Sequence, residues 1–74
     1  MNFQELVSVE LARARTIHPK SPDLEDLFYT LDSQLSKFRI LITAEPHPPP
    51  PPFVLERLVK IATLAQRAAE DFLQ

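Results

Sequence analysis

Residues 46–52 read Pro-His-Pro-Pro-Pro-Pro-Pro, and long helical patterns flank this stretch on both sides. Proline fixes the backbone angle φ and has no N–H group, so we expect neither a helix nor a central strand across five prolines in succession. The run therefore divides the helical sequence into two helices joined by a stiff, extended connector. As polyproline II the connector would reach about 20 Å, and the second of these helices can return antiparallel to the first.

A further helix is predicted before these two, at about residues 2–17. It should end at His18-Pro19, because the residue before a proline avoids the α region. The evidence for the helix is a set of apolar residues that recur every three or four positions, as is typical of an amphipathic helix. They are Phe3, Leu6, Val7, Leu11, Ala14 and Ile17.

The helix before the proline run is predicted at about residues 22–44. Ser21 can cap it and Pro22 suits its first position. The acidic residues that follow, Asp23, Glu25 and Asp26, favour the positive end of the helix dipole. Apolar residues then step by four, three, four, three and four, which predicts a seam that packs against another helix. These are Leu24, Phe28, Leu31, Leu35, Phe38 and Ile42.

The helix after the proline run is predicted at about residues 53–73 and carries two apolar strips. Two strips on one helix indicate two neighbours, of which one can be the preceding helix and the other another subunit. Glu56 and Lys60 are expected to form an (i, i+4) ion pair on its polar side. The first strip is Leu55, Leu58, Ala62, Ala65, Ala69 and Phe72, and the second is Val54, Ile61, Leu64 and Ala68.

The size of the chain favours association. We interpret the 74 residues, with a mass of 8.5 kDa, as a single domain spanning residues 1–74. Burial of apolar surface in a lone globule of this mass yields roughly 110 kcal/mol, and ordering the residues costs about the same. Because the sequence has no cysteine, disulfides cannot supply the missing margin, and association is expected to supply it.

The expected fold is therefore an all-α oligomeric bundle, a dimer or higher oligomer built from a long antiparallel helical hairpin and a leading helix. The small residues among the predicted interface positions would permit close approach of helices. We place the oligomer interface at Leu31, Leu35, Phe38, Ile42, Leu58, Ala62, Ala65 and Ala69. An acidic side chain at Leu35 should then dissociate the oligomer and unfold much of the chain.

Composition excludes several functional classes. The sequence has no glycine, which phosphate-binding loops and dinucleotide fingerprints require, and the lack of cysteine excludes thiolate-ligated zinc. A net charge of −2 argues against a nucleic-acid partner, which usually demands a basic face. No run approaches about 18 consecutive apolar residues, so no membrane span is predicted. With no secretory signal at Met1, we expect a cytoplasmic location.

No residue pattern indicates a catalytic, cofactor-binding or metal-binding site. His18 and His47 both precede proline in connecting segments, and spacing offers no further ligands for a metal, so we interpret them as solvated or turn-capping. The proline run at 46–52 can serve either as a rigid connector, which we favour, or as a ligand for an aromatic-lined domain of a protein partner.

Parts of the first and last helices resemble a known family. The sequence Glu-Leu-Ala-Arg-Ala-Arg at residues 10–15, followed by His18-Pro19, resembles the opening helix of small bacterial and phage proteins of the MazG-like type. Residues 58–62 (Leu-Val-Lys-Ile-Ala) and 65–71 (Ala-Gln-Arg-Ala-Ala-Glu-Asp) resemble their closing helix. The resemblance implies an all-α nucleoside triphosphate pyrophosphohydrolase fold that assembles as helical dimers or tetramers.

This chain departs from that family at the metal site. The family pattern is Glu-Glu-x-x-Glu on one helix and Glu-x-x-Asp on a later one, which hold Mg²⁺ against the substrate phosphates. The best-matching segments here, residues 33–37 (Ser-Gln-Leu-Ser-Lys) and 57–60 (Arg-Leu-Val-Lys), have none of these carboxylates. A cation about 4 Å from Mg²⁺ costs roughly 8 kcal/mol at an effective dielectric constant of 20.

A shifted register is a weaker alternative for a metal site. It would use Glu25-Asp26 with Asp32 and Glu56, but Tyr29 stands where the third carboxylate is needed. We therefore expect a non-catalytic helical oligomerisation or interaction module that resembles a MazG-like protein without its metal site, and no cofactor. The alternatives are a Mg²⁺-dependent nucleoside triphosphate pyrophosphohydrolase and an adaptor that presents the proline run to a partner.

Overall fold

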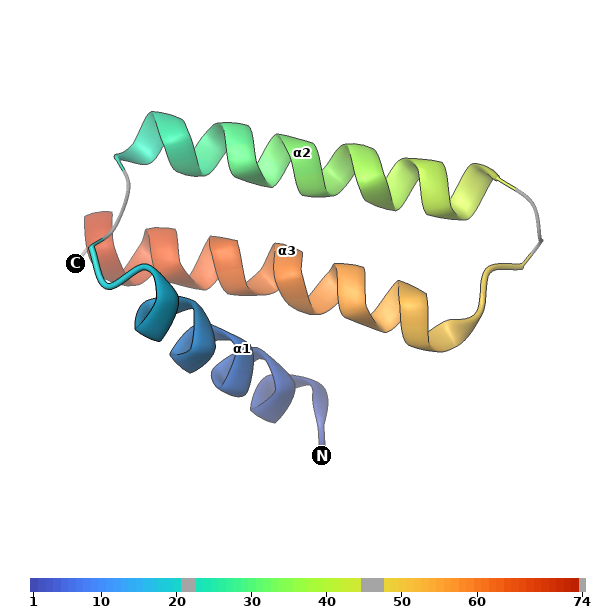
Figure 1. The fold of residues 1–74 in the computed structure, drawn as a ribbon, viewed down its shortest axis with the longest axis horizontal. Coiled ribbons are helices and arrows are strands. Elements are labelled where there is room, and N and C mark those ends of the chain that lie inside the picture. Colours follow the sequence, from blue (N-terminus) through green and yellow to red (C-terminus); the bar gives the residue numbers. More distant parts are fainter. Residues whose placement is uncertain (21–22, 45–47, 74) are drawn as a thin grey trace.

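A computed structural model describes residues 1–20, 23–44 and 48–73. These residues form three helices, α1 (Phe3–Ile17), α2 (Leu24–Thr43) and α3 (Pro51–Phe72), and contain no strand. Figure 1 shows α2 and α3 side by side and antiparallel, with α1 crossing one side of α3 obliquely. The predicted all-α fold and its helical hairpin are therefore confirmed.

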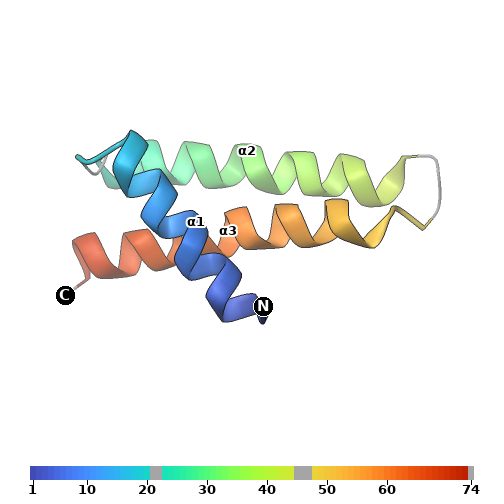
Figure 2. The ribbon, with the colours of Figure 1, turned by 60° about the horizontal axis from the view of Figure 1, so that its bottom comes forward.

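Helix α3 is the central element of the fold. It contacts both α1 and α2, whereas no Cα atom that the structure describes in α1 lies within 8 Å of one in α2. The turned view in Figure 2 shows α1 lying across the C-terminal half of α3 and leaving the other half of α3 uncrossed. The arrangement is an open hairpin with a third helix on one side.

The ends of α1 follow from its sequence. Asn2 caps the helix, because its Oδ1 accepts the N–H of Glu5 at 2.8 Å while Glu5 Oε1 accepts the N–H of Asn2 at 3.4 Å. This reciprocal pair is a capping box, which satisfies two backbone donors at once. The helix ends at Ile17 with His18 as its C-cap, as the following proline predicts.

Helix α2 begins two residues later than predicted. The expected cap Ser21 and first helical residue Pro22 lie outside the described residues. Asp23 is the N-cap that the structure shows, with its Oδ1 accepting the N–H of Asp26 at 2.8 Å. An aspartate is among the best capping residues, and here its own charge also favours the helix N-terminus.

Helix α3 begins two residues earlier than predicted, inside the proline run. Pro51 and Pro52 occupy its first two positions, where the missing N–H would have no partner in the helix and the fixed φ suits helical geometry. The expectation that the run contains no helix is therefore wrong for these two residues. Pro50, the N-cap, is extended with φ −58° and ψ 131°. The expected connector falls partly on residues 46 and 47, which lie outside the described part of the chain.

The core is small for a chain of this length. The buried apolar residues are Val7 and Leu11 from α1, Leu27 from α2 and Val59 from α3. The chain exposes 5348 Å². A compact monomer of its mass would expose about 4,700 Å². The chain therefore exposes about 700 Å² more than a compact monomer would, and this additional surface is available for burial against a partner.

Candidate interaction face

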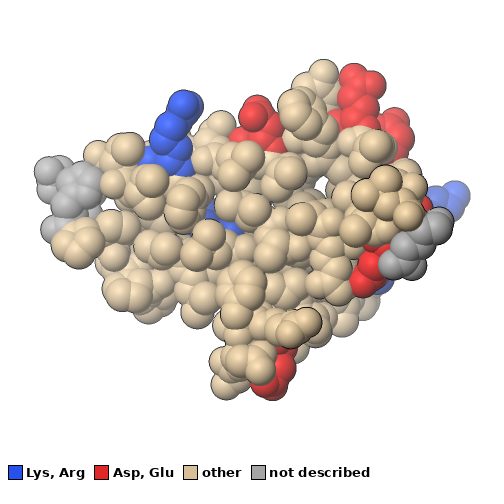
Figure 3. Space-filling view, turned by 180° about the vertical axis from the view of Figure 1, so that it is seen from behind, with Lys and Arg blue, Asp and Glu red and all other residues tan. Residues whose placement is uncertain are grey.

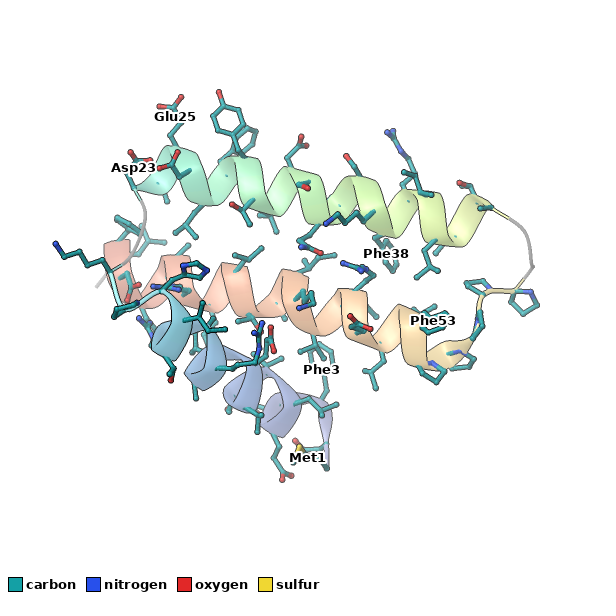
Figure 4. The ribbon with its side chains drawn as sticks, in the orientation of Figure 1. Met1, Phe3, Asp23, Glu25, Phe38 and Phe53 are labelled. Carbon is teal, nitrogen blue, oxygen red and sulfur yellow. The ribbon has the colours of Figure 1, made fainter. Side chains whose placement is uncertain are left out.

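The exposed apolar surface of α2 is a line of residues on one side of the helix. Phe28, Leu35 and Ile42 are seven residues apart and therefore share that side. Their exposed fractions are 60%, 47% and 42%. Leu31 and Phe38, which alternate with them in the predicted seam, are half-buried. Figure 4 shows Phe38 between α2 and α3. The seam thus divides into residues facing α3 and residues facing outward.

The exposed apolar surface of α3 continues that of α2. Of the first predicted strip, all residues except the half-buried Ala62 are exposed, and the second strip is half-buried. Every residue of the exposed strip is apolar. The exposed members are Leu55, Leu58, Ala65, Ala69 and Phe72.

We call the surface formed by Phe28, Leu35, Ile42, Leu58, Ala65 and Phe72 the back face. Figure 3, seen from behind, shows a broad surface that is mostly uncharged, with a small blue area near its middle, a larger blue group toward its upper left and most acidic groups at its rim. Five of the eight predicted interface residues are exposed, namely Leu35, Ile42, Leu58, Ala65 and Ala69. The other three, Leu31, Phe38 and Ala62, are half-buried. A largely apolar surface with few charges is typical of an interaction site.

The other side of the hairpin carries a polar cleft of about 280 Å³ between α1 and α2, with α3 as its floor. Polar residues of all three helices line it. Its polar lining comes from Glu10, Arg13 and His18, from Thr30 and Gln34 of α2, and from Lys60 and Thr63 of α3.

Glu10 is the centre of charge in this cleft. Its Oε1 lies 2.6 Å from Arg13 Nη2 and 3.3 Å from Lys60 Nζ. The hydrogen bond from Arg13 is the main reason why the pKa of Glu10 falls from 4.5 to about 2, and Lys60 lowers it further against the opposing effect of burial. Lys60 therefore connects α3 to α1 instead of forming the predicted pair with Glu56. An (i, i+4) spacing on one helix could not reveal this contact with another helix.

Next to the cleft, α2 and α3 are joined by a hydrogen bond between Gln34 and Arg57. Arg57 Nη1 donates a hydrogen bond to Gln34 Oε1 at 2.8 Å. Both residues belong to the segments 33–37 and 57–60 that the resemblance aligns with metal ligands. The amide and the guanidinium thus occupy the place where the resemblance expects carboxylates.

The described part of the chain brings no metal-binding set of side chains together. Within residues 1–20, 23–44 and 48–73, no group of three or more His, Asp or Glu side chains could hold a metal ion. The shifted acidic set of Glu25, Asp26, Asp32 and Glu56 is therefore not assembled. His18 is exposed at the edge of the cleft, and His47 lies outside the described residues. None of the described helices is long and apolar enough to cross a membrane.

Two arginines join the C-terminal end of α1 to α3, and sequence analysis missed both contacts. Arg15 pairs with Asp71 through two hydrogen bonds of 2.9 and 3.2 Å and with Glu70 Oε1 at 3.0 Å. Arg67 is buried and donates to the backbone carbonyls of His18 and Lys20. Its Nε makes no hydrogen bond but lies 3.5 Å from Asp71, close enough for an ion pair.

Comparison with known protein families, with curated proteins and with solved structures finds no match for this chain. The resemblance to MazG-like proteins therefore stays a prediction, and the functional argument rests on the chain's own residues.

Proposed function

We propose that this protein is a non-catalytic helical module that self-associates through the back face. The observation that carries the proposal is the contrast between four buried apolar residues, among those that the structure describes, and the exposed apolar residues on both helices of the hairpin. A chain with so small a core has little stability of its own. Association would bury the back face and supply stability that the monomer lacks.

The exposed area is of the right size for a dimer. If each copy buries the excess of about 700 Å², the pair buries about 1,400 Å², which lies within the range of stable protein interfaces. Solvent-exposed apolar groups such as Leu35 and Leu58 would supply the desolvated centre of the interface. The resemblance to a family of helical dimers and tetramers also favours self-association.

The absence of catalysis is proposed from the residues at the aligned metal positions. Five residues replace the carboxylates that Mg²⁺ requires, and three of them are cations; they are Ser33, Gln34, Lys37, Arg57 and Lys60. Like charge repels a divalent metal, so the site would bind Mg²⁺ poorly. Incubation of the purified protein with a panel of nucleoside triphosphates and Mg²⁺ should release no pyrophosphate above a protein-free control. Release of pyrophosphate would overturn this part of the proposal.

Self-association is tested by placing one charge on the back face and one elsewhere on the same helix. Leu35→Asp would bury a carboxylate in the interface, and we expect it to weaken association at least 100-fold. Ile40→Asp is the matched control, because Ile40 is 63% exposed and lies about 140° around α2 from Leu35.

Sedimentation equilibrium measures the mass of each variant. We expect the wild type and Ile40→Asp to have at least twice the 8.5 kDa of one chain, and Leu35→Asp to approach that of one chain. A monomeric wild type, or a Leu35→Asp variant that keeps the wild-type mass, would contradict the proposal.

A further inference from the structure

We propose that two copies associate about a two-fold axis that passes beside Leu35, so that each α2 packs antiparallel on the α2 of a second copy. This inference rests on the proposed self-association and specifies its geometry. Three observations carry it: the division of charge along α2, the even spacing of the exposed apolar residues, and the place of two opposite charges beside them.

Charge divides α2 into two halves of opposite sign. Its N-cap and first half carry four carboxylates and no cation, at Asp23, Glu25, Asp26 and Asp32. Its second half, residues 34–43, carries Lys37 and Arg39 and no carboxylate. Figure 4 shows Asp23 and Glu25 together at the N-terminal end of α2. Electrostatic complementarity between surfaces of this kind selects orientation more than it adds affinity.

Two simple two-fold arrangements can bring two back faces together. A two-fold axis parallel to α2 and α3 would place α2 over α3 of the second copy. It would also set the acidic N-terminal end of α2 beside the same acidic end of the second copy. An axis across the hairpin reverses the direction of the second copy and, when it passes beside Leu35, brings Asp32 of one α2 beside Arg39 of the other, while the other three carboxylates fall beyond the cations of the other α2. Only the second arrangement pairs opposite charges along α2, so the charges favour it.

The apolar residues of α2 fix where that axis crosses the helix. Leu35 lies midway between Phe28 and Ile42 in sequence and on the same side of the helix. In an antiparallel pair centred on Leu35, this residue meets its own counterpart, and Phe28 meets Ile42 of the second copy. The line of three residues is therefore complementary to itself, as a two-fold interface requires.

Asp32 and Arg39 lie beside this line and would form ion pairs across the interface. Both residues line one shallow hollow together with Leu35, so all three occupy the same side of α2. In the antiparallel arrangement centred on Leu35, Asp32 of one copy comes level with Arg39 of the other to within one residue. The two-fold axis would produce this pair twice.

Cysteine cross-linking tests the geometry, because the protein has no cysteine of its own. Leu35→Cys should form a covalent dimer under mild oxidation. Phe28→Cys and Ile42→Cys should each form little covalent dimer when oxidised alone. They should cross-link to each other when the two variants are mixed, with one of them carrying a mass tag. Ile40→Cys, which lies away from the back face, should not cross-link at the same concentration and serves as the control.

The outcomes separate this inference from the function on which it rests. A monomeric wild type would overturn both. A stable wild-type dimer in which Leu35→Cys does not cross-link to itself would overturn the antiparallel geometry and leave self-association standing. Cross-linking of Leu35→Cys to Leu58→Cys in a mixture, with none between two copies of Leu35→Cys, would indicate the axis along the hairpin.

Charge reversal tests the ion pairs independently. We expect Asp32→Arg and Arg39→Asp each to raise the dimer dissociation constant about tenfold, and the double variant to return it to within about threefold of the wild type. Lys37→Glu is the control, since Lys37 lies on another side of α2 and should change the constant less than threefold. A double variant weaker than either single one would overturn the pairing of Asp32 with Arg39.

Discussion

The two sides of α3 differ in the kind of contact that they offer. The side toward α1 carries Lys60, Thr63 and Arg67, and its charged groups make ion pairs or hydrogen bonds with α1 or the backbone that follows it. The side that belongs to the back face carries Leu58, Ala65 and Phe72, none of which is charged. One helix thus contacts its internal neighbour through the apolar Val59 and through charged and polar groups, whereas its residues on the back face are all uncharged.

This difference teaches how a short chain can specify both its fold and its assembly. Directional polar contacts fix where α1 lies, because hydrogen bonds require particular donors and acceptors at particular distances. An apolar face is less specific in geometry but provides the area that a small core cannot. Disruption of the first side should therefore affect folding, and disruption of the second should affect association.

The largest effects on stability and association are expected from substitutions at two adjacent residues of α3, one in the core and one on the back face. Val59 is 9% exposed and belongs to the core, whereas Leu58 is 39% exposed on the back face. Val59→Asp should destabilise the fold by more than about 3 kcal/mol, because it buries a carboxylate without a partner. Leu58→Asp should leave that internal packing intact and weaken association instead.

Circular dichroism and sedimentation on the same samples distinguish the two results. Val59→Asp should lose helical signal at all protein concentrations. Leu58→Asp should recover helical signal as the concentration rises, because its folding remains linked to association. If both variants unfold alike and independently of concentration, the division of α3 into an internal and an external side is wrong.

The second effect concerns the buried guanidinium on the internal side. Arg67→Leu removes the donors to the carbonyls of His18 and Lys20. Hydrogen bonds from a charged donor contribute about 1.5–3 kcal/mol each, but these carbonyls belong to exposed residues that water can reach, so we expect a total loss of about 2–3 kcal/mol. Urea unfolding measures the loss, and Glu56→Gln, at an exposed residue of the same helix, is the control. A loss below about 0.5 kcal/mol would show that Arg67 does not fix the end of α1.

Much of the fold was predictable because its signals are local. Proline after His18, the acidic residues at the start of α2 and the apolar periodicity each act within a few residues, and they place all three helices to within two residues of their ends. The start of α3 was misplaced because the rule applied to Pro22, that proline suits the first turn of a helix, was not applied to the end of the proline run. Pro51 and Pro52 stand in the first turn of α3, where that rule holds.

The contacts of the polar side were not predictable, since their partners lie far apart in sequence. Arg15 and Asp71 are 56 residues apart, and Lys60 and Glu10 are 50 apart. Periodicity shows which side of a helix is apolar but does not show which neighbour covers it. For the same reason the seam of α2 could be identified while its division into Leu31 and Phe38, toward α3, and Leu35, outward, could not.

The smallest effect is a pH dependence confined to the polar side. Glu10 has a pKa of about 2 in the folded protein, chiefly because Arg13 donates hydrogen bonds to it, against 4.5 as its ordinary value. As the pH falls from 4.5 toward 2, the Glu10 carboxyl takes up a proton in the unfolded chain but stays ionised in the folded one. The stabilisation by ionised Glu10 is therefore complete above about pH 4.5 and is lost as the pH approaches 2. After allowance for the solvent around exposed Arg13, the loss is about 1–2 kcal/mol.

Urea unfolding from pH 5 to pH 2 should show this loss in the wild type and a flatter profile in Glu10→Gln. Titration of the Glu10 carboxyl by NMR provides the sharper measurement. Arg13→Gln should raise the pKa of Glu10 more than Lys60→Gln does, because the Arg13 hydrogen bond is the largest cause of the shift. The reverse order would contradict the structure of the cleft. Glu10→Gln should leave the sedimenting mass at pH 7 unchanged, since Glu10 lies on α1, away from the back face; a lower mass would mean that the two sides of α3 are not independent.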